Sequence, residues 1–431
     1  MGTTRVVTPG WLGTGGSMRS MAALDLDRVR TWFPALWSGP GAGEARFDGP
    51  GGSLVPSRVA DAVADAMTAG MCQRGSLTPL QRRTEETVGA ARAALGDLLG
   101  TDPRGVVVGR SMTALTFEMA RTLAQGWGPG DEVVVTRLDH DSNIRPWVLA
   151  AERVGATVRW LDFDPVTAEL DDVRGVLSER TRLVAVTAAS NLFGTRPDVA
   201  AISAAAHEVG ALVYVDAVHL AAHALVDRAA LGADLVACSP YKFFGPHLGA
   251  VAADPALLET LQPDKLLPST DAVPERFELG TLPYELLAGV TASVEALADL
   301  LEQPTHEGGE LPRRERLAAS MAAVEEHEDA LLARLLDGLD ALPGVHVHGS
   351  PARRTPTVLL SVEGHDPVAV QEHLVGHGVL APAGSFYALE ASRHAGLGDA
   401  GGVRVGLSPY STPEEVERLL TGLAALTSSQ E

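Results

Sequence analysis

The sequence predicts an α/β protein with a parallel sheet, and one stretch in the middle of the chain carries this prediction. A short apolar run, Ala211–Val215, has the Val and Leu content of a strand that is buried on both faces, and it ends on Asp216. The helical pattern of Leu220–Leu231 follows, and a second apolar run, Asp234–Cys238, ends on Ser239. Buried strands that alternate with helices are typical of parallel sheets.

A carboxylate and an amine follow these two strands. Asp216 ends the first, and Lys242 lies just beyond the second, beside Phe243 and Phe244. Parallel sheets bind ligands at the carboxyl ends of their strands, so we expect both groups at one site. A Lys and an Asp placed there can serve pyridoxal phosphate (PLP), because the Lys bonds to the aldehyde of the cofactor and the Asp partners its pyridine nitrogen. Apolar surroundings also lower the pKa of a lysine, as a nucleophilic amine requires.

The motifs Asp216-Ala-Val-His219 and Ser239-Pro-Tyr-Lys242, at this interval, resemble those of the class V aminotransferase family, which includes the cysteine desulfurases. The resemblance extends from about Phe33 to the C-terminus. It implies PLP fold type I, with a large domain built on a mainly parallel seven-stranded sheet between helices and a smaller α+β C-terminal domain. We expect a disordered lead-in at 1–23, an N-terminal segment at 24–54 that packs with the small domain, the large PLP-binding domain at 55–300 and the small domain at 301–431.

Composition restricts the class of protein. The chain has 431 residues, of which 45% are hydrophobic, so it is long enough for two domains. Its 55 acidic and 34 basic residues give a net charge of −21, which argues against nucleic acid or an anionic membrane as a partner. No apolar run is long enough to span a bilayer, and the first residues lack the apolar core of a signal peptide. We therefore expect a soluble cytoplasmic protein.

The remaining elements follow from hydrophobic periodicity. Further strands of the large domain are predicted at Gly105–Val108, Glu132–Thr136, Thr157–Phe163 and Leu183–Thr187, and helices at Leu24–Leu36, Arg58–Ala69, Leu80–Leu99 and Ala288–Leu300. The long helix Arg316–Leu342 leads into the small domain, where we expect strands at Val345–His348, Thr357–Val362 and Gly402–Gly406 and helices at Pro367–His377 and Thr412–Leu426.

A phosphate site is predicted where a strand runs into the helix that starts near Ser111. Backbone N–H groups and the helix dipole gather anions at such a point, and the family places its phosphate-binding turn here, at Ser111, Met112 and Thr113. An ordinary helix cap explains Ser111 equally well on its own. Ser239 and Tyr241 are the expected phosphate partners from the central stretch.

The turn at Gly280 and Thr281 is a second expected phosphate contact. By resemblance it reaches across a dimer interface to the phosphate of the neighbouring subunit, which implies a homodimer with shared active sites. From the residues alone it is a turn before a helix.

Three further polar residues are expected beside the cofactor. By resemblance, His140 stacks on the cofactor ring; a surface-loop histidine is the alternative. Asn191 follows another strand, where its amide donates to the phenolic oxygen of PLP or to a substrate carboxylate, or caps a turn. His219 and His223 have the spacing of one helical face, and we expect His219 near the phenolic oxygen and His223 in a structural or surface role. No Glu follows His219, so the metalloprotease pattern is absent, and we expect no metal site.

Substrate groups are expected from three segments. Arg404 lies in VRVGLSPYSTPEEVERLL, which is similar to the family's segment for the substrate α-carboxylate, and a guanidinium suits a carboxylate; a surface arginine is the alternative. The loop at Gly51 and Gly52 is expected to approach the ligand, with a plain turn as its alternative. Ser385 and Phe386 lie on the loop that matches the catalytic loop of the desulfurases.

That loop, Leu380–Ser392, departs from the desulfurase pattern. Desulfurases carry a thiol there, whereas this stretch reads LAPAGSFYALEAS and has no cysteine. Cys72 lies far upstream, and Cys238 ends a buried strand, so neither has the setting of a reactive thiolate. The variant resembles a desulfurase-like subgroup that lacks the loop cysteine.

These observations favour a PLP-dependent β-lyase that cleaves a cysteine S-conjugate to a thiol, pyruvate and ammonia, in natural-product biosynthesis. The alternatives are a decarboxylation-dependent oxidative deaminase of an S-linked cysteine, as in lincosamide pathways, and an aminotransferase or an epimerase. A PLP-binding regulatory protein is the non-enzymatic alternative; it would lose substrate groups, yet Arg404 and His140 are both present.

Overall fold

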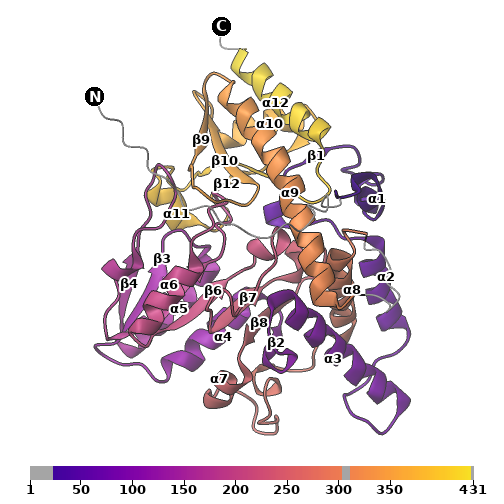
Figure 1. Ribbon diagram of the computed structural model, residues 1–431, viewed down its shortest axis with the longest axis vertical. Helices are drawn as coiled ribbons and strands as arrows, with labels where there is room; N and C mark the ends of the chain where they lie inside the picture. The colour runs from indigo at the N-terminus through magenta and orange to yellow at the C-terminus, as the bar shows by residue number, and fades with distance from the viewer. Residues whose placement is uncertain (1–22, 303–310, 429–431) are drawn as a thin grey trace, which may run out of the picture.

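The computed structural model describes residues 23–302 and 311–428, and its centre is a seven-stranded sheet (Figure 1). The order across the sheet is β2 (Val106–Gly109), β8 (Gly249–Ala253), β7 (Leu235–Cys238), β6 (Leu212–Asp216), β5 (Thr181–Thr187), β3 (Glu132–Thr136) and β4 (Thr157–Leu161). Strand β8 runs antiparallel to both of its neighbours, and the other neighbouring strands of this sheet pair in parallel. The mainly parallel seven-stranded sheet is confirmed.

Alternate side chains of the strands enter two separate cores, one on each face of the sheet. Val213 and Val215 pack on one face, against α3 (Pro79–Leu99), α6 (Val199–Glu208) and α8 (Tyr284–Ala298). Tyr214 points to the other face, against α4 (Met112–Ala124) and α5 (Arg145–Val154). This burial on both faces explains the continuous apolar runs in the sequence. Helix α2 (Ser57–Thr68) packs on α8, and α7 (Pro255–Thr260) follows β8.

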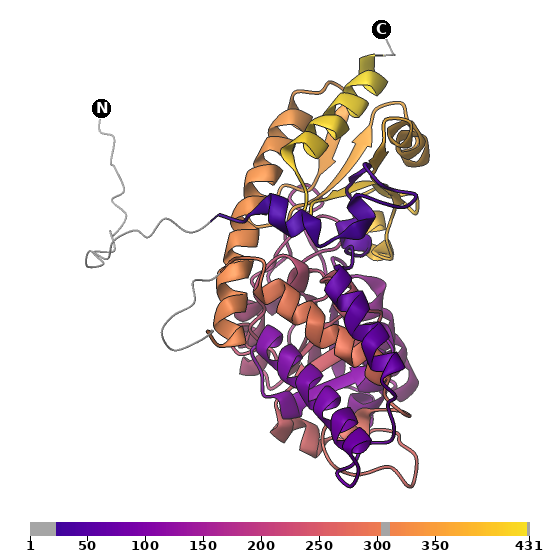
Figure 2. The same ribbon diagram turned by 90° about the vertical axis from the view of Figure 1, so that its right-hand side faces the viewer.

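A smaller sheet lies at the C-terminal end of the molecule. Its order is β12 (Ala383–Gly384), β13 (Gly402–Gly406), β10 (Thr357–Val362) and β9 (Val345–His348), and every pairing is antiparallel. The sheet shares a core with α9 (Arg313–Asp340), α10 (Pro367–Val375) and α12 (Pro413–Ser428), while α11 (Leu389–His394) lies nearer the large sheet. Figure 2 shows α9 as the long helix that passes from the part of the molecule with the large sheet to the part with the small sheet.

The N-terminal segment contacts both parts. Strand β1 (Ala45–Arg46) pairs in parallel with β11 (Val379–Leu380), and Phe47 enters the core of the small sheet. Phe33, in contrast, belongs to the core of the large sheet. Residues 46–52 therefore bridge the two sheets, next to the ends of β6 and β7. The division of the chain at residues 55 and 301 stays a prediction, and the predicted lead-in lies almost entirely outside the described residues.

Two predicted helices are wrong in extent. The one at Leu24–Leu36 ends early, as α1 (Leu26–Thr31), and a separate 3-10 turn follows at Pro34–Leu36. The cause is Pro34, because a proline disfavours helical backbone angles at the residue before it and has no N–H group to donate. The helix at Leu220–Leu231 is only a 3-10 turn, Leu220–Ala222.

Some local backbone bonds remain near the two ends of this second segment, while its middle bonds to other parts of the protein. The N–H of Arg228 donates to the carbonyl of Leu99, and the carbonyl of Val226 accepts from Arg314. Tertiary contacts thus replace the helix that the periodicity predicts. Among residues 23–302 and 311–428, no helix has the length and apolar character to cross a membrane.

Candidate active site

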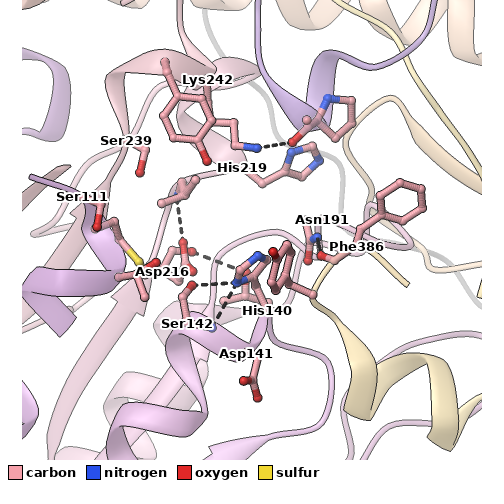
Figure 3. A pocket seen from close by; sticks show the side chains of 18 of the residues that line it. Ser111, His140, Asp141, Ser142, Asn191, Asp216, His219, Ser239, Lys242 and Phe386 are labelled. Carbon is pink, nitrogen blue, oxygen red and sulfur yellow. Dashed lines mark hydrogen bonds between the residues drawn. The ribbon is translucent and has the colours of Figure 1, made fainter. Parts of the chain in front are cut away.

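A cavity of about 710 Å³ opens at the carboxyl ends of the large-sheet strands, between that sheet and the small one (Figure 3). Most of the predicted site residues line it: Gly51, Ser111, Met112, Thr113, His140, Asn191, Asp216, His219, Ser239, Tyr241, Lys242, Phe386 and Arg404. They come from segments that are far apart in the sequence. The strand ends and the intervening loops thus bring together the groups that the motifs singled out.

Asp216 is the last residue of β6, and its carboxylate is 5% exposed. Its Oδ1 accepts the N–H of Val218 at 2.9 Å, which fixes the side chain at the strand end. Burial raises the pKa of Asp216 to about 6, while the Val218 N–H and the Lys242 amine act in the opposite direction. The carboxylate is therefore mainly ionised at neutral pH and able to stabilise a cation in the cavity.

Lys242 ends a short 3-10 turn, Pro240–Lys242, directly after β7. Its Nζ donates to the carbonyl of Pro50, in the N-terminal loop. Burial lowers the pKa of the amine to about 8, and the Arg404 guanidinium lowers it further in the same direction, whereas Asp48 and Asp216 raise it. A substantial fraction of this amine is thus neutral near physiological pH, as a nucleophile or a base requires.

His140 follows β3 and lies against the cavity. Its Nδ1 accepts the backbone N–H of Ser142 at 3.0 Å, so the proton of the neutral ring belongs on Nε2. Burial, with Lys242 and Arg404 nearby, lowers the pKa of His140 to about 4, so the ring is neutral at physiological pH. The ring of Tyr387 stacks on it at 5.5 Å between centroids.

Asp139, the residue before His140, anchors this corner and is fully buried. Its carboxylate accepts hydrogen bonds from Thr136, from Asn143 at 2.7 Å and from the N–H of Thr187 at 3.1 Å. These bonds join the ends of β3 and β5 and hold the His140 segment in place. Burial is the largest influence on Asp139 and raises its pKa to about 8.

The start of α4 forms one end of the cavity. Ser111 caps the helix by accepting the N–H of Ala114 at 3.1 Å, and Met112 and Thr113 follow it along the cavity wall. Gly249 of β8 faces this turn so closely that a Cβ atom there would lie 2.1 Å from the N of Met112. A glycine at 249 therefore lets the helix start approach the sheet. The capping role and an anion-binding role of Ser111 are compatible, because the remaining N–H groups of the first turn stay available.

Arg404 enters the cavity from β13 and is 3% exposed. Its Nη1 donates to the carbonyl of Asn191 at 3.1 Å, and its Nη2 donates to Oδ1 of Asp48 at 3.1 Å. The ring of Phe386 covers the guanidinium at 3.8 Å. Burial lowers the pKa of Arg404 to about 10, against the influence of Asp48, so the group stays a cation at neutral pH. Arg404 is thus the fixed positive charge of the small-sheet side.

The loop that carries Phe386 is backbone-strained. Phe386 and Tyr387 have φ values of 53° and 58°, in the left-handed region that non-glycine residues rarely adopt. Asn191 Nδ2 donates to the carbonyl of Phe386 at 2.9 Å, and the N–H of Asp141 donates to that of Tyr387 at 2.7 Å. Asn191 Oδ1 is buried and accepts no hydrogen bond from the described residues. The cavity walls thus hold this loop in its strained form.

His219 lines the cavity, and its Nε2 contacts the hydroxyls of Thr355 and Thr357 at 3.0 and 3.1 Å. His223 lies behind it, with the two ring centroids 4.9 Å apart, and its Nδ1 is 2.9 Å from Oε2 of the buried Glu328. Burial is the main cause that lowers the pKa of His219 well below its usual value. His223 therefore has structural contacts only, whereas His219 also faces the cavity.

Four predicted residues lie outside the lining. Gly52 packs on the Tyr241 ring, where a Cβ would lie 3.5 Å from a ring carbon, and Ser385 precedes the loop residues that reach the cavity. Gly280 and Thr281 are exposed on this chain. The cavity also has lining residues that sequence analysis did not assign to it: Asp48, Pro50, Phe117, Asp141, Ser142, Arg145, Thr187, Ala189, Val218, Pro382 and Tyr387. Asp48 had a signal, since it precedes the Gly-rich loop, but its partner Arg404 is 356 residues away.

Neither cysteine lines the cavity. Cys238 is buried at the end of β7, and burial raises the pKa of its thiol to about 12, with Asp216 acting in the same direction. Cys72 precedes α3, and its Sγ lies 3.4 Å from the carbonyl of Gln73. Among the residues that the structure describes, no cluster of three His, Cys, Asp or Glu side chains is placed to hold a metal ion.

Comparison with known proteins identifies the class. The family model "Aminotransferase class-V" matches residues 46–309 and 315–419, and the chain belongs to this family. Enzymes of this family are PLP-dependent, and so is this one, which acts on an amino acid. The cavity fits the cofactor, since it combines a buried carboxylate, an amine of lowered pKa and a helix start at its edges.

Individual relatives match this chain over most of its length. An uncharacterized protein, MT3887, of Mycobacterium tuberculosis is 37% identical over 94% of this chain and 100% of the relative. The aminotransferase-like protein FGM3 of Gibberella zeae is 31% identical over 94% of this chain and 99% of the relative. The apo structure of a cysteine desulfurase from Thermococcus onnurineus superposes with a TM-score of 0.83 at 25% identity, over 96% of this chain and 100% of that one.

Proposed function

We propose that this enzyme is a C–S β-lyase that converts a cysteine S-conjugate and water into a thiol, pyruvate and ammonia, in a natural-product pathway. One observation carries the proposal: the loop beside Arg404 presents Phe386 and Tyr387 to the cavity, where a persulfide-forming enzyme needs a thiol. Without a nucleophilic sulfur, the S-substituent leaves as a thiol instead of handing its sulfur to the protein.

In this proposal, different cavity residues bind different parts of the cofactor. Lys242 bonds to its aldehyde, Asp216 partners the pyridine nitrogen, and His140 covers its ring. We expect Asn191 and His219 to contact its phenolic oxygen. The helix start with Ser111, Met112 and Thr113, together with Ser239 and Tyr241, receives the phosphate. Bound PLP supplies an electron sink for the pair of electrons left at the substrate Cα.

The reaction itself needs three groups of the chain. Arg404 binds the α-carboxylate, and Gly51, Gly52, Ser385 and Phe386 bound the substrate nearby. Lys242, with its pKa near 8, removes the Cα proton and holds it on Nζ. Asp216 stays ionised and stabilises positive charge at the far end of the cavity. The covering of Arg404 by Phe386 excludes water, which strengthens the electrostatic interactions inside.

The proposed assembly is a homodimer with shared active sites in the cytoplasm. Gly280 and Thr281 are exposed on this chain, next to Leu279, which is 53% exposed, so a second subunit can cover them. In the dimer they would reach the phosphate of the neighbouring site. Light scattering tests this, because a monomer with full PLP occupancy would contradict shared sites.

A carboxyl-labelled S-alkyl cysteine tests the reaction. Bound PLP would stabilise the electron pair left by whichever Cα bond breaks, and Arg404 would hold the carboxylate so that the Cα–H bond faces Lys242. In that case, the label is recovered in pyruvate in equal amount to the thiol. Label released as carbon dioxide, with an aldehyde and oxygen consumption, would show the decarboxylating oxidative deaminase instead. Transfer of the amino group to a keto acid, with the C–S bond intact, would show an aminotransferase.

A further inference from the structure

The carboxylate-binding arginine of this cavity already has a carboxylate partner. Arg404 is 3% exposed at its side chain, and Oδ1 of Asp48 accepts from its Nη2 at 3.1 Å. Nη1 is used by the carbonyl of Asn191, and Phe386 covers the guanidinium. Nε is buried and has no hydrogen-bond partner among the described residues. A carboxylate that bonds two nitrogens of a guanidinium uses either Nε with Nη2 or Nη1 with Nη2, and both arrangements include the nitrogen that Asp48 already holds. An incoming carboxylate therefore meets the charge of Asp48 at Nη2.

The N-terminal loop is built to aim Asp48 at this position. The backbone of Asp48 bridges to Gly406 of β13, and its carbonyl accepts the N–H groups of Gly51 and Gly52. The side chain passes over Gly51 so closely that a Cβ there would lie 2.3 Å from Oδ1 of Asp48. Any side chain at position 51 would push this carboxylate away. The absence of a side chain at Gly51 is thus a condition for the Asp48–Arg404 pair.

We propose that Asp48 is a specificity-determining residue, an internal carboxylate that occupies the place of the substrate carboxylate on Arg404 and competes with it. The inference rests on the proposed function only in taking Arg404 as the substrate's carboxylate site. With Asp48 in place, Arg404 is never a buried charge without a partner, so a ligand that lacks a carboxylate does not leave it unpaired. Asp48 therefore weakens the preference of the cavity for carboxylate-bearing ligands.

The proposed competition predicts that a substitution of Asp48 changes the affinity for carboxylates in an unusual direction. Removing a polar group from a binding site usually weakens binding, whereas Asp48→Asn removes the competitor and strengthens carboxylate binding. Asp48 is 33% exposed, so it can turn toward solvent when a carboxylate arrives, and a side chain at position 51 forces the same movement without removing the charge. The two substitutions, Asp48→Asn and Gly51→Ala, thus have the same expected direction.

Acetate is the probe, because it carries a carboxylate and no amine. The melting temperature of the holoenzyme is followed as sodium acetate replaces sodium chloride at constant ionic strength, and the rise gives the dissociation constant. We expect Asp48→Asn to bind acetate about tenfold more tightly than the wild type, as for loss of a close competing charge, and Gly51→Ala to bind it more tightly too. Asp162→Asn is the matched control, since Asp162 pairs with Arg137 and neither residue lines the cavity, so acetate binding should stay unchanged.

Arg404→Gln separates this inference from the proposed function. It should abolish the acetate effect; if it binds acetate like the wild type, Arg404 is not the carboxylate site, and both the assignment and the inference fall. If Arg404→Gln loses acetate binding while Asp48→Asn and Gly51→Ala bind acetate as the wild type does or more weakly, only the proposed competition is overturned. Methylammonium completes the test, because stabilisation of the wild type that disappears in Asp48→Asn would assign Asp48 to the substrate amine instead.

Discussion

The two walls of the cavity are held together by different means. On the large-sheet wall, polar groups sit at strand ends; Asp216 bonds to the nearby N–H of Val218, and Lys242 reaches the N-terminal loop, at the carbonyl of Pro50. On the small-sheet wall, Arg404 depends on side chains and carbonyls from distant segments, including Asp48. The first wall is a consequence of strand geometry, and the second is a consequence of how the two sheets meet.

Both walls carry backbone strain, since Phe244, two residues after Lys242, has a φ of 72°. The residues after β6 and β7 adopt short 3-10 turns, Leu220–Ala222 and Pro240–Lys242. The facing loop holds Phe386 and Tyr387 in the left-handed region. Strained residues persist only where their surroundings fix them. We expect the greater effects from the large-sheet wall, because in the proposed function it carries the lysine and the carboxylate that hold the cofactor.

The largest effect is expected at Lys242. Lys242→Ala should reduce turnover by at least about a thousandfold, because in the proposed function it removes both the attachment point of PLP and the base. The purified wild type should be yellow, and the variant should lose the visible absorption of the attached cofactor. Circular dichroism of the variant provides the control for folding. An unchanged visible spectrum in Lys242→Ala would contradict the assignment of this lysine.

The second effect concerns stability at the corner of Asp139. Asp139→Ala leaves Asn143 and the N–H of Thr187 without an acceptor in a fully buried position, which should lower the free energy of unfolding by about 3 kcal/mol. Urea denaturation measures this value. The matched variant is Asp141→Ala, whose side chain is partly exposed and pairs with Arg145, and which should cost less than about 1 kcal/mol. Equal losses in the two variants would show that Asp139 does not anchor the strand ends.

The sequence predicts the large-sheet wall far better than the small-sheet wall, for a physical reason. Asp216, Lys242 and Ser111 each follow an apolar strand directly, so their place in space is fixed by their place in the chain. Asp48 reaches the cavity through its contact with Arg404, 356 residues away, and no local pattern encodes such a contact; Phe386 is expected there only by resemblance. The false helix at Leu220–Leu231 has the same origin, because distant partners take backbone groups in its middle.

The third prediction links the two walls electrostatically. Arg404 is a cation near Lys242 and contributes to the lowered pKa of its amine, so Arg404→Gln should raise that pKa above its present value of about 8. The amine is neutral above its pKa, so attachment of PLP to the apoprotein should need a higher pH in the variant. The pH dependence of the attachment rate measures the shift. A midpoint that stays the same or moves to lower pH would mean that the walls are electrostatically independent.

The fourth prediction concerns strain in the loop. Tyr387→Gly should stabilise the backbone, since glycine adopts a φ of 58° freely, and the Tyr387 side chain is 77% exposed and buries little surface. We expect a change in unfolding free energy of less than about 1 kcal/mol, with turnover reduced only by the loss of the stacked ring on His140. Tyr387→Ala is the control, because alanine loses the ring and keeps the strain. Equal stability of the two variants would show that the left-handed backbone costs nothing here.

The smallest effect is expected at the cysteines, and it decides between two kinds of sulfur chemistry. A desulfurase needs a thiolate that reaches the substrate sulfur, whereas a β-lyase needs none. Burial raises the pKa of Cys238 to about 12, so its thiol stays protonated, and neither Cys238 nor Cys72 lines the cavity. Replacing both by Ser should therefore leave turnover within about one order of magnitude. Cys238→Ala is the control that distinguishes a loss caused by poorer packing at this buried position from a loss caused by a missing thiol. A loss of about a thousandfold, as for removal of a catalytic group, at unchanged stability would instead assign sulfur transfer to a cysteine of this chain.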